Sequence, residues 1–221
     1  MVDFDKIWVE KYRPKTLSDI ILDNRTLEII KEFKDEIPNL LFVGNPGTGK
    51  TTLAQIIVND ILKCNYLYIN ASDESGIDTI RHNITNFAQT KSFDGKVKVV
   101  ILDEADGLTT QAQSALRNTM ETYAKYCRFV LTANYKHKII PALQSRCQAL
   151  DIKPVVESAV KRCYNILKNE NITVPEEQKK KFIQLVKRHF PDLRKTINEL
   201  QKNIIDSELC IVSVTGDNEL L

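Results

Sequence analysis

Residues 39–51, NLLFVGNPGTGKT, decide the fold. They open on a short aliphatic run, Asn39–Val43, which indicates a buried strand that leads into a glycine-rich loop. Apolar side chains at helical spacing follow from Leu53 to Ile61. Gly44–Thr51 fits the pattern G-x-x-x-x-G-K-[ST], with a strand before it and a helix after it. The pattern predicts a loop whose backbone N–H groups face a phosphate chain at the positive end of a helix.

The polar residues of this loop predict its ligand. Lys50 is expected to reach the β and γ phosphates of a nucleotide, and the Thr51 hydroxyl to bind Mg²⁺. The alternative, an ordinary strand–turn–helix connection, is disfavoured because four constraints are met in one frame. We therefore predict a site for a nucleoside triphosphate and Mg²⁺ that includes Gly44, Asn45, Pro46, Gly47, Thr48, Gly49, Lys50, Thr51 and Thr52.

Two carboxylates follow another aliphatic run, Val97–Leu102. Asp103 suits a partner of Mg²⁺, and Glu104 suits the base that orients the attacking water. Asn134, at the end of a later run, offers an amide for the same water. Arg146 lies just before a further run. On local sequence alone, Asn134 also suits a helix-start turn and Arg146 also suits a surface position.

Strand-like runs recur along the first two thirds of the chain and alternate with helical or turn segments, which favours a parallel sheet covered on both faces. They are Asn39–Val43, Tyr66–Asn70, Val97–Leu102, Arg128–Ala133 and Gln148–Ile152. After Ile152 the pattern becomes helical. We expect helices at Val156–Glu170, Glu176–His189 and Pro191–Asn203, and either a helix or a strand at Glu208–Val214. The predicted domains are 1–153, an α/β nucleotide-binding domain, and 154–221, a small helical domain.

Composition narrows the class of protein. The chain has 221 residues with 31 Lys and Arg against 29 Asp and Glu, so a polycation that coats nucleic acid is disfavoured. Its five cysteines are widely spaced, which argues against a disulfide framework or a zinc site. With no targeting or membrane-spanning segment visible, we expect a soluble intracellular protein, nuclear in a eukaryote and cytoplasmic in a prokaryote or virus.

Several short motifs together resemble the sliding-clamp loader subunits, most closely the small subunits of replication factor C. They are Val9-Glu10-Lys11-Tyr12-Arg13-Pro14, the phosphate loop, Asp103-Glu104-Ala105-Asp106, Thr132-Ala133-Asn134 and Ser145-Arg146-Cys147. Two others, Ser92-Phe93-Asp94-Gly95 and Phe190-Pro191-Asp192-Leu193-Arg194-Lys195-Thr196, are more similar to the clamp-loader ATPase of tailed phages.

The resemblance implies a P-loop AAA+ fold with a five-stranded parallel sheet and a helical lid. It implies that Asn134 and Arg194 sense the γ-phosphate and that Arg146 enters a neighbouring subunit's ATP site. It places Val9, Tyr12, Arg13 and Pro14 around the nucleotide base and phosphates. DNA contacts would come from Ser75, Gly76, Ile77 and Arg81, and coupling to the ATP site from Gln113 and Arg117.

The sequence departs from the family pattern at some of these positions. Ser75 stands where cellular subunits commonly carry arginine, and Asn118 replaces a second arginine after Arg117. We also expect the 221 residues to lack the collar domain of the cellular subunits.

The function implied is that of a clamp-loader ATPase, active mainly within an oligomer. Its expected partners are other loader subunits in a ring or spiral, a pentamer by resemblance, together with the sliding clamp and primer–template DNA. The clamp would dock on the outer end of the helix Thr109–Tyr123. Alternatives are another DNA-handling AAA+ ATPase, such as a branch-migration motor or helicase loader, and a nucleotide-binding scaffold subunit.

Overall fold

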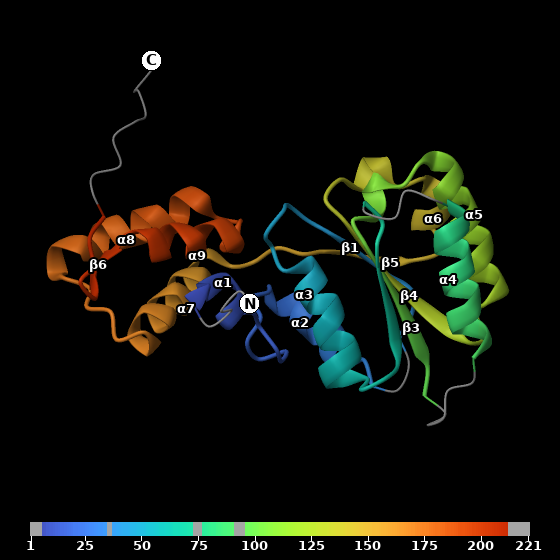
Figure 1. Ribbon diagram of the computed structural model, residues 1–221, viewed down its shortest axis with the longest axis horizontal. Helices are drawn as coiled ribbons and strands as arrows, with labels where there is room; N and C mark the ends of the chain where they lie inside the picture. Colours follow the sequence, from blue (N-terminus) through green and yellow to red (C-terminus); the bar gives the residue numbers. More distant parts are fainter. Residues whose placement is uncertain (1–5, 35–36, 73–76, 91–95, 212–221) are drawn as a thin grey trace, which may run out of the picture. The chain divides into compact units, whose positions relative to one another are not determined.

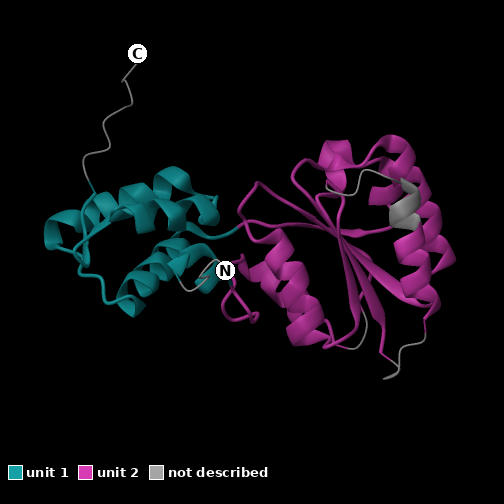
Figure 2. Cartoon of the chain, viewed as in Figure 1, with its two compact units in different colours: residues 1–13, 154–221 teal, residues 14–153 magenta. Residues whose placement is uncertain are grey.

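The computed structural model describes residues 6–34, 37–72, 77–90 and 96–211, with the side chains of 77–81 left out. The chain divides into two compact units, residues 14–153 and residues 1–13 with 154–221 (Figure 2). Among the described helices, none is both long and apolar enough to cross a membrane.

The unit 14–153 is built on a five-stranded sheet (Figure 1), with neighbours in the order β2-β3-β4-β1-β5. All its pairings are parallel, which confirms the fold predicted from the alternating pattern. The strands are β1 (Leu40–Val43), β2 (Tyr66–Asn70), β3 (Lys98–Asp103), β4 (Cys127–Ala133) and β5 (Gln148–Asp151).

Helices cover both faces of the sheet because its side chains alternate between two buried clusters. Leu40 and Phe42 of β1 pack into one cluster, with α2 (Asn24–Lys31) and α3 (Lys50–Ile56). Leu41 and Val43 pack into the other, with residues of the three helices on the opposite face. These are α4 (Ile77–Gln89), α5 (Thr110–Thr122) and α6 (Pro141–Gln144).

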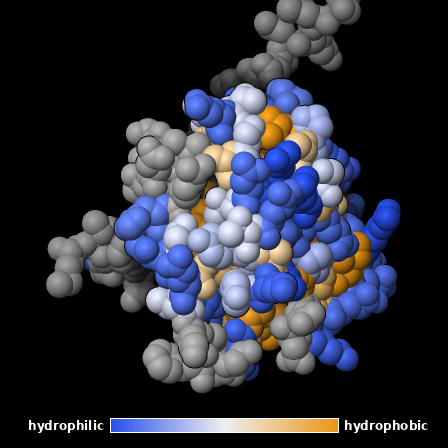
Figure 3. All heavy atoms as spheres, turned by 90° about the vertical axis from the view of Figure 1, so that its right-hand side faces the viewer, coloured by the Kyte–Doolittle hydropathy of each residue, from blue (hydrophilic) through white to orange (hydrophobic). Residues whose placement is uncertain are grey.

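Short helical segments complete this unit. They are η2 (Ile57–Ile61), a π-helical continuation of α3, and the 3-10 turns η3 (Ala105–Gly107) and η4 (Lys136–Lys138). The α5 helix starts one residue later than expected because the Thr109 side chain caps it, accepting from Ala112 N–H. On the face seen in Figure 3, polar side chains predominate and apolar ones form small groups between them.

The second unit is helical. Its helices α7 (Val156–Asn169), α8 (Glu176–His189) and α9 (Leu193–Lys202) pack on one another around buried residues such as Cys163, Phe182 and Leu200. The α9 helix begins two residues after the predicted start because Asp192 is its N-cap, and its side chain accepts from Lys195 N–H. Glu208–Leu209 forms strand β7, paired with β6 (Ile204–Ile205), and 212–214 lie outside the described residues.

Residues 1–13 differ from expectation. We predicted them with the first domain, 1–153, but they group with the helical unit, since α1 (Trp8–Lys11) packs against α9. Trp8, the only tryptophan of the chain, is 6% exposed there. None of the five cysteines, all of which lie within the described ranges, takes part in a disulfide.

Candidate nucleotide-binding site

The loop between β1 and α3 has the backbone that its glycines predict. Gly47 and Gly49 have φ angles of 73° and 95°, in the left-handed region that side chains with a Cβ avoid. At Gly44 a Cβ would lie 2.7 Å from the carbonyl oxygen of Ile152, which follows β5. The two backbone segments can therefore lie this close only because Gly44 has no side chain. No side chain caps the first turn of α3, and its N–H groups stay available to an anion.

Lys50 lies at the start of α3 and is 8% exposed. Its Nζ donates to the Gly44 carbonyl oxygen at 3.0 Å, to the Asn45 carbonyl oxygen at 2.9 Å and to Asn134 Oδ1 at 2.8 Å. The lysine therefore joins the phosphate loop to the residue that follows β4. The structure brings together two predicted site residues, Lys50 and Asn134, that are 84 positions apart.

Asp103, at the end of β3, accepts hydrogen bonds from three hydroxyl groups. Thr51 Oγ1 donates at 2.7 and 2.9 Å, Tyr68 OH at 2.7 Å and Thr132 Oγ1 at 2.5 Å. Because β2 and β4 flank β3, they bring Tyr68, in the middle of β2, and Thr132, near the end of β4, to this carboxylate. Mg²⁺ prefers oxygen ligands and is usually held by one or two carboxylates with a hydroxyl and waters. The Thr51 and Asp103 oxygens fit such an ion.

Glu104 follows Asp103 but has a left-handed backbone, with φ 55°. The turn directs its side chain away from the buried strand, and the residue is exposed. Its Oε2 accepts from Ser72 Oγ at 2.7 Å, and its N–H donates to Thr132 Oγ1 at 3.0 Å. A strained backbone that is fixed by two neighbours is typical of functional sites.

Asp106 fixes the end of β4. Its Oδ2 accepts from the N–H groups of Asn134 at 3.2 Å and Tyr135 at 3.1 Å. The carboxylate therefore sets the backbone of Asn134 while Lys50 holds its side chain. Sequence reasoning gave no role to Asp106, Tyr68, Thr132 or Ser72, although Asp106 and Thr132 stand inside the quoted motifs.

Arg146 precedes β5, whereas Asp103 ends β3 and Gly44 and Asn134 directly follow β1 and β4. The amino and carboxyl ends of a four-residue strand such as β5 are about 13 Å apart, at roughly 3.3 Å per residue. The guanidinium donates to the Ala142 carbonyl oxygen at 3.0 Å and pairs with Glu121 of α5. It therefore lies at the opposite end of the sheet from its own chain's phosphate loop.

The coupling residues on α5 differ in environment. Gln113 is 1% exposed, and its Nε2 donates to the carbonyl oxygens of Leu108 at 3.1 Å and Lys138 at 2.9 Å. Its Oε1 accepts from Ile140 N–H at 2.8 Å, so α5 is tied to the segment after β4. Arg117 instead donates to Asn118 Oδ1, at 2.8 and 3.2 Å.

The predicted DNA contacts fall at the start of α4. Ser75 and Gly76 lie outside the described residues. Ile77 and Arg81 lie on α4, and their side chains are not described. Their role stays a prediction.

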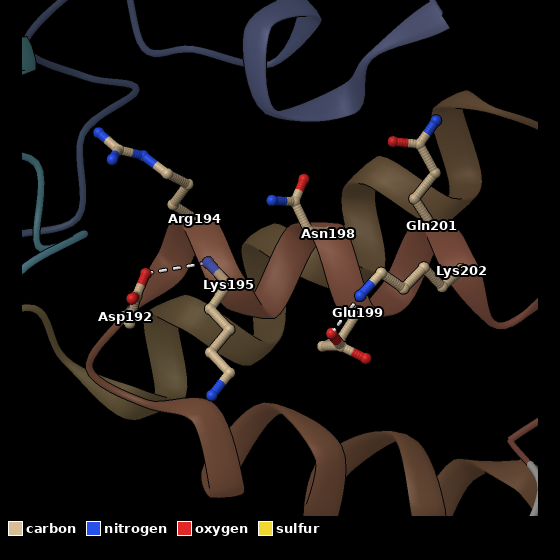
Figure 4. A pocket seen from close by; sticks show the side chains of 7 residues that line it. All are labelled: Asp192, Arg194, Lys195, Asn198, Glu199, Gln201 and Lys202. Carbon is tan, nitrogen blue, oxygen red and sulfur yellow. Dashed lines mark hydrogen bonds and ion pairs between the residues drawn. The ribbon is translucent and has the colours of Figure 1, made fainter.

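In the helical unit, Arg194 is an exposed residue of the first turn of α9. It lines a cavity of about 590 Å³ (Figure 4), and it points to the same side of the helix as Asn198 and Gln201. The lining residues are Asp192, Arg194, Lys195, Asn198, Glu199, Gln201 and Lys202. Of the N-terminal motif, Tyr12 donates to Glu170 Oε1 and Arg13 to Glu10 Oε1.

Comparisons with known proteins agree with this geometry. The model of the ATPase family associated with various cellular activities (AAA) matches residues 40–154. A second model, the AAA+ ATPase lid domain of the sliding-clamp-loader large subunit, matches residues 151–209.

Among curated relatives, the chain is similar to replication factor C small subunits. It is 43% identical to that of Archaeoglobus fulgidus and 44% identical to that of Methanococcus vannielii, over 89% of this chain and 63% and 64% of theirs. Identity to replication factor C subunit 3 of Saccharomyces cerevisiae is 42%, over 88% of this chain and 58% of that one. The chain thus covers slightly under two thirds of these relatives' length.

Among solved structures, the RuvB Holliday junction branch migration motor of Thermotoga maritima shares the fold. It has a TM-score of 0.68 over 87% of this chain and 64% of its own, at 19% identity. The likeness at that identity concerns the fold alone.

Proposed function

Because this chain belongs to the AAA family of ATPases, we propose that it is an ATPase subunit of a sliding-clamp loader, which couples ATP binding and hydrolysis to the loading of a clamp on primer–template DNA. The observation that carries the proposal is the clamp-loader lid match at 151–209, directly after the AAA match. The replication factor C small subunits support the same function. RuvB supports the fold alone, so a branch-migration motor is not favoured.

The proposed reaction is hydrolysis of the bond between the β and γ phosphates of ATP. Gly47 and Gly49 let the loop backbone face the phosphates, and Lys50 supplies a fixed positive charge beside them. Mg²⁺, when bound, neutralises charge that develops on the phosphate oxygens. Thr51 and Asp103 would hold it, and they are already in contact at 2.7 Å.

Glu104 is the proposed general base. It would accept a proton from the attacking water, and Asn134 would hold that water or the γ-phosphate through its amide. Ser72 and Thr132 keep Glu104 in place, and Asp106 keeps Asn134 in place. Thr132 belongs to β4, whereas Ser72 and Asp106 lie in the segments that follow β2 and β3, so the proposed base and sensor are both fixed at the carboxyl edge of the sheet.

Arg146 is proposed to act in trans, on a neighbouring subunit. Its place at the amino end of β5 separates it from its own phosphate loop. A guanidinium next to developing phosphoryl charge contributes on the order of 10³–10⁵ in rate. Hydrolysis would then depend on assembly with other loader subunits. ATP binding would allow the assembled loader to bind the clamp and DNA.

The test measures ATP turnover of the assembled loader with and without its clamp and primer–template DNA. We expect DNA and clamp together to raise turnover, and the increase to fall steeply with salt because phosphate contacts release counterions. Blunt duplex DNA of the same length is the matched control and should stimulate less. ATP turnover that does not change when clamp and primed DNA are added, at any salt concentration, would contradict the proposal.

A further inference from the structure

The N-terminal segment, residues 6–13, is fastened to α9 through one glutamine. Trp8 N–H donates to Gln201 Oε1 at 3.1 Å, and Gln201 Nε2 donates to the Lys6 carbonyl oxygen at 2.6 Å. The amide thus uses both a donor and an acceptor on the segment. Since Trp8 is also buried, the start of α1 is held by hydrogen bonds and by packing.

A second attachment joins the end of the segment to α7. Tyr12 OH donates to Glu170 Oε1 at 2.5 Å, and Arg162 Nη2 donates to the Tyr12 carbonyl oxygen at 3.0 Å. Lys11 pairs with the same Glu170 oxygen at 2.6 Å. The side chain of Tyr12 is therefore fixed by Glu170, at the C-cap of α7, and its backbone by Arg162, in the middle of the same helix.

The charges at this attachment suit a strong hydrogen bond. Burial and the hydrogen bond to Glu170 raise the pKa of Tyr12 to about 12, so its hydroxyl keeps its proton. Burial acts to raise the pKa of Glu170, but hydrogen bonds from Lys11 and Tyr12 outweigh it and lower that pKa. A neutral phenol thus donates to a carboxylate, and such charge-assisted bonds are roughly twice as strong as neutral ones.

Two sets of proposed nucleotide contacts consequently belong to one compact unit. Tyr12 and its neighbours are proposed to flank the base, and Arg194 of α9 is proposed to meet the γ-phosphate. The same unit holds both the segment and α9. A change in the position of the helices would therefore move the base contacts with them.

We propose, on the premise of the proposed function, that Glu170 and Arg162 are positioning residues for nucleotide binding. They hold Tyr12 so that the base-contacting segment and the Arg194-bearing helix act as one part. The ligand concerned is the nucleoside portion of ATP, the part that a bare phosphate chain lacks. Neither residue touches the phosphates in this proposal.

The experiment compares two ligands of the full chain, ATP and inorganic tripolyphosphate, by calorimetry. In Glu170→Ala the loss of a hydrogen bond to a charged group should weaken ATP binding about tenfold. Binding of tripolyphosphate, which has no base or ribose, should stay within about twofold. Glu170→Gln keeps an acceptor oxygen for Tyr12 and should recover most of the ATP affinity, and Tyr12→Phe should resemble Glu170→Ala.

Glu157→Ala is the matched control, since Glu157 is an exposed carboxylate in the first turn of α7, the helix that Glu170 caps at its other end. It should leave both affinities unchanged. Wild-type ATP affinity in Glu170→Ala would overturn the positioning role, and so would an equal loss for both ligands, because that is the signature of a damaged fold. Lys50→Ala tests the proposed phosphate site separately from the positioning role. It should weaken the binding of both ATP and tripolyphosphate. A wild-type chain that binds neither ligand would overturn both the proposed function and the positioning role.

Discussion

The carboxyl edge of the sheet and the arginines proposed for catalysis differ in how far the chain itself completes them. At the edge, Asp103 receives three hydroxyl groups and Lys50 has three oxygen acceptors, all from the same chain. Arg194 is exposed, and no hydrogen bond to it is found within the described residues. Arg146 pairs on the surface with Glu121, away from its own phosphate loop.

This difference indicates how the proposed ATPase is controlled. A polar centre with fixed partners costs no reorganisation when charge develops on the substrate, so it can be ready in a lone subunit. Guanidinium groups on the surface deliver their charge only when something brings them to the phosphates. The edge of the sheet would then set binding, and the arginines would set when hydrolysis occurs.

The largest predicted effect is that of Arg146→Ala, and its absence would remove the distinction between the edge of the sheet and the surface arginines. Arg146→Ala should lower ATP turnover of the assembled loader by about 10³-fold or more, since arginines at phosphoryl transfer contribute on the order of 10³–10⁵. ATP affinity of the isolated chain should barely change, because the residue lies at the other end of the sheet. Steady-state turnover and equilibrium binding check the two parts.

Arg25→Ala is the control for that variant, because Arg25 is an exposed arginine on α2 of the same unit. It should leave turnover of the assembled loader unchanged. A lone monomer that loses as much turnover as the assembly on Arg146→Ala would place the arginine in cis and remove the distinction between the two regions.

A smaller effect, confined to the edge of the sheet, sharpens the comparison. Glu104→Gln should lower turnover by about 10²–10⁴-fold, the contribution of a positioned general base. ATP affinity should persist, since the amide keeps the shape of the side chain and Lys50, Thr51 and Asp103 are intact. Single-turnover hydrolysis and nucleotide binding measure these separately.

The matched control is Glu28→Gln, an exposed glutamate on α2. If the Glu104→Gln loss appeared as weaker ATP binding with an unchanged hydrolysis rate, Glu104 would be a binding residue. The base would then have to be sought elsewhere.

The sequence predicted the parts of the site that are local in the chain. The loop, Lys50 and Asp103 stand in patterns whose spacing follows directly from a strand, a turn and a helix. Asn134 was predicted from its position at the end of a strand. The hydrogen-bond partners of Asp103 were not predicted, since Tyr68 is 35 positions away from it in the sequence and Thr132 is 29 positions away. Those contacts depend on strand order, which single-sequence patterns do not give.

The grouping of residues 1–13 was missed for the same reason. Trp8 and Gln201 are 193 positions apart, and Tyr12 and Glu170 are 158 apart. A motif that resembles a nucleotide contact gave no sign of the helices that hold it. The predicted boundary after residue 153 had a local signal, Pro154 and the loss of strand-like runs, whereas the break after Arg13 had none.

The smallest effects concern two helix caps, one on each unit. Asp23 caps α2 and accepts from the Thr26 N–H at 3.0 Å, and Asp192 caps α9 and accepts from the Lys195 N–H at 2.9 Å. Removing either cap by mutation to alanine should cost about 1 kcal/mol of unfolding free energy. Denaturation followed by circular dichroism measures both, and the fluorescence of Trp8 reports on the helical unit.

Only one of the two variants should also weaken ATP binding. Asp192→Ala loosens the turn that carries Arg194, whereas Asp23→Ala loosens a helix with no proposed nucleotide contact. Equal losses of ATP affinity in both variants would mean that general stability, and not the placement of the arginine, limits nucleotide binding.

The stabilising effect of the Asp23 cap should depend on pH. Burial acts to raise the pKa of Asp23, but hydrogen bonds from Thr26 outweigh it and hold the pKa below its ordinary 3.8. The ionised form is therefore the stabilising one. The stability advantage of wild type over Asp23→Ala should be present above pH 3.8 and fade as the pH falls through the folded-state pKa.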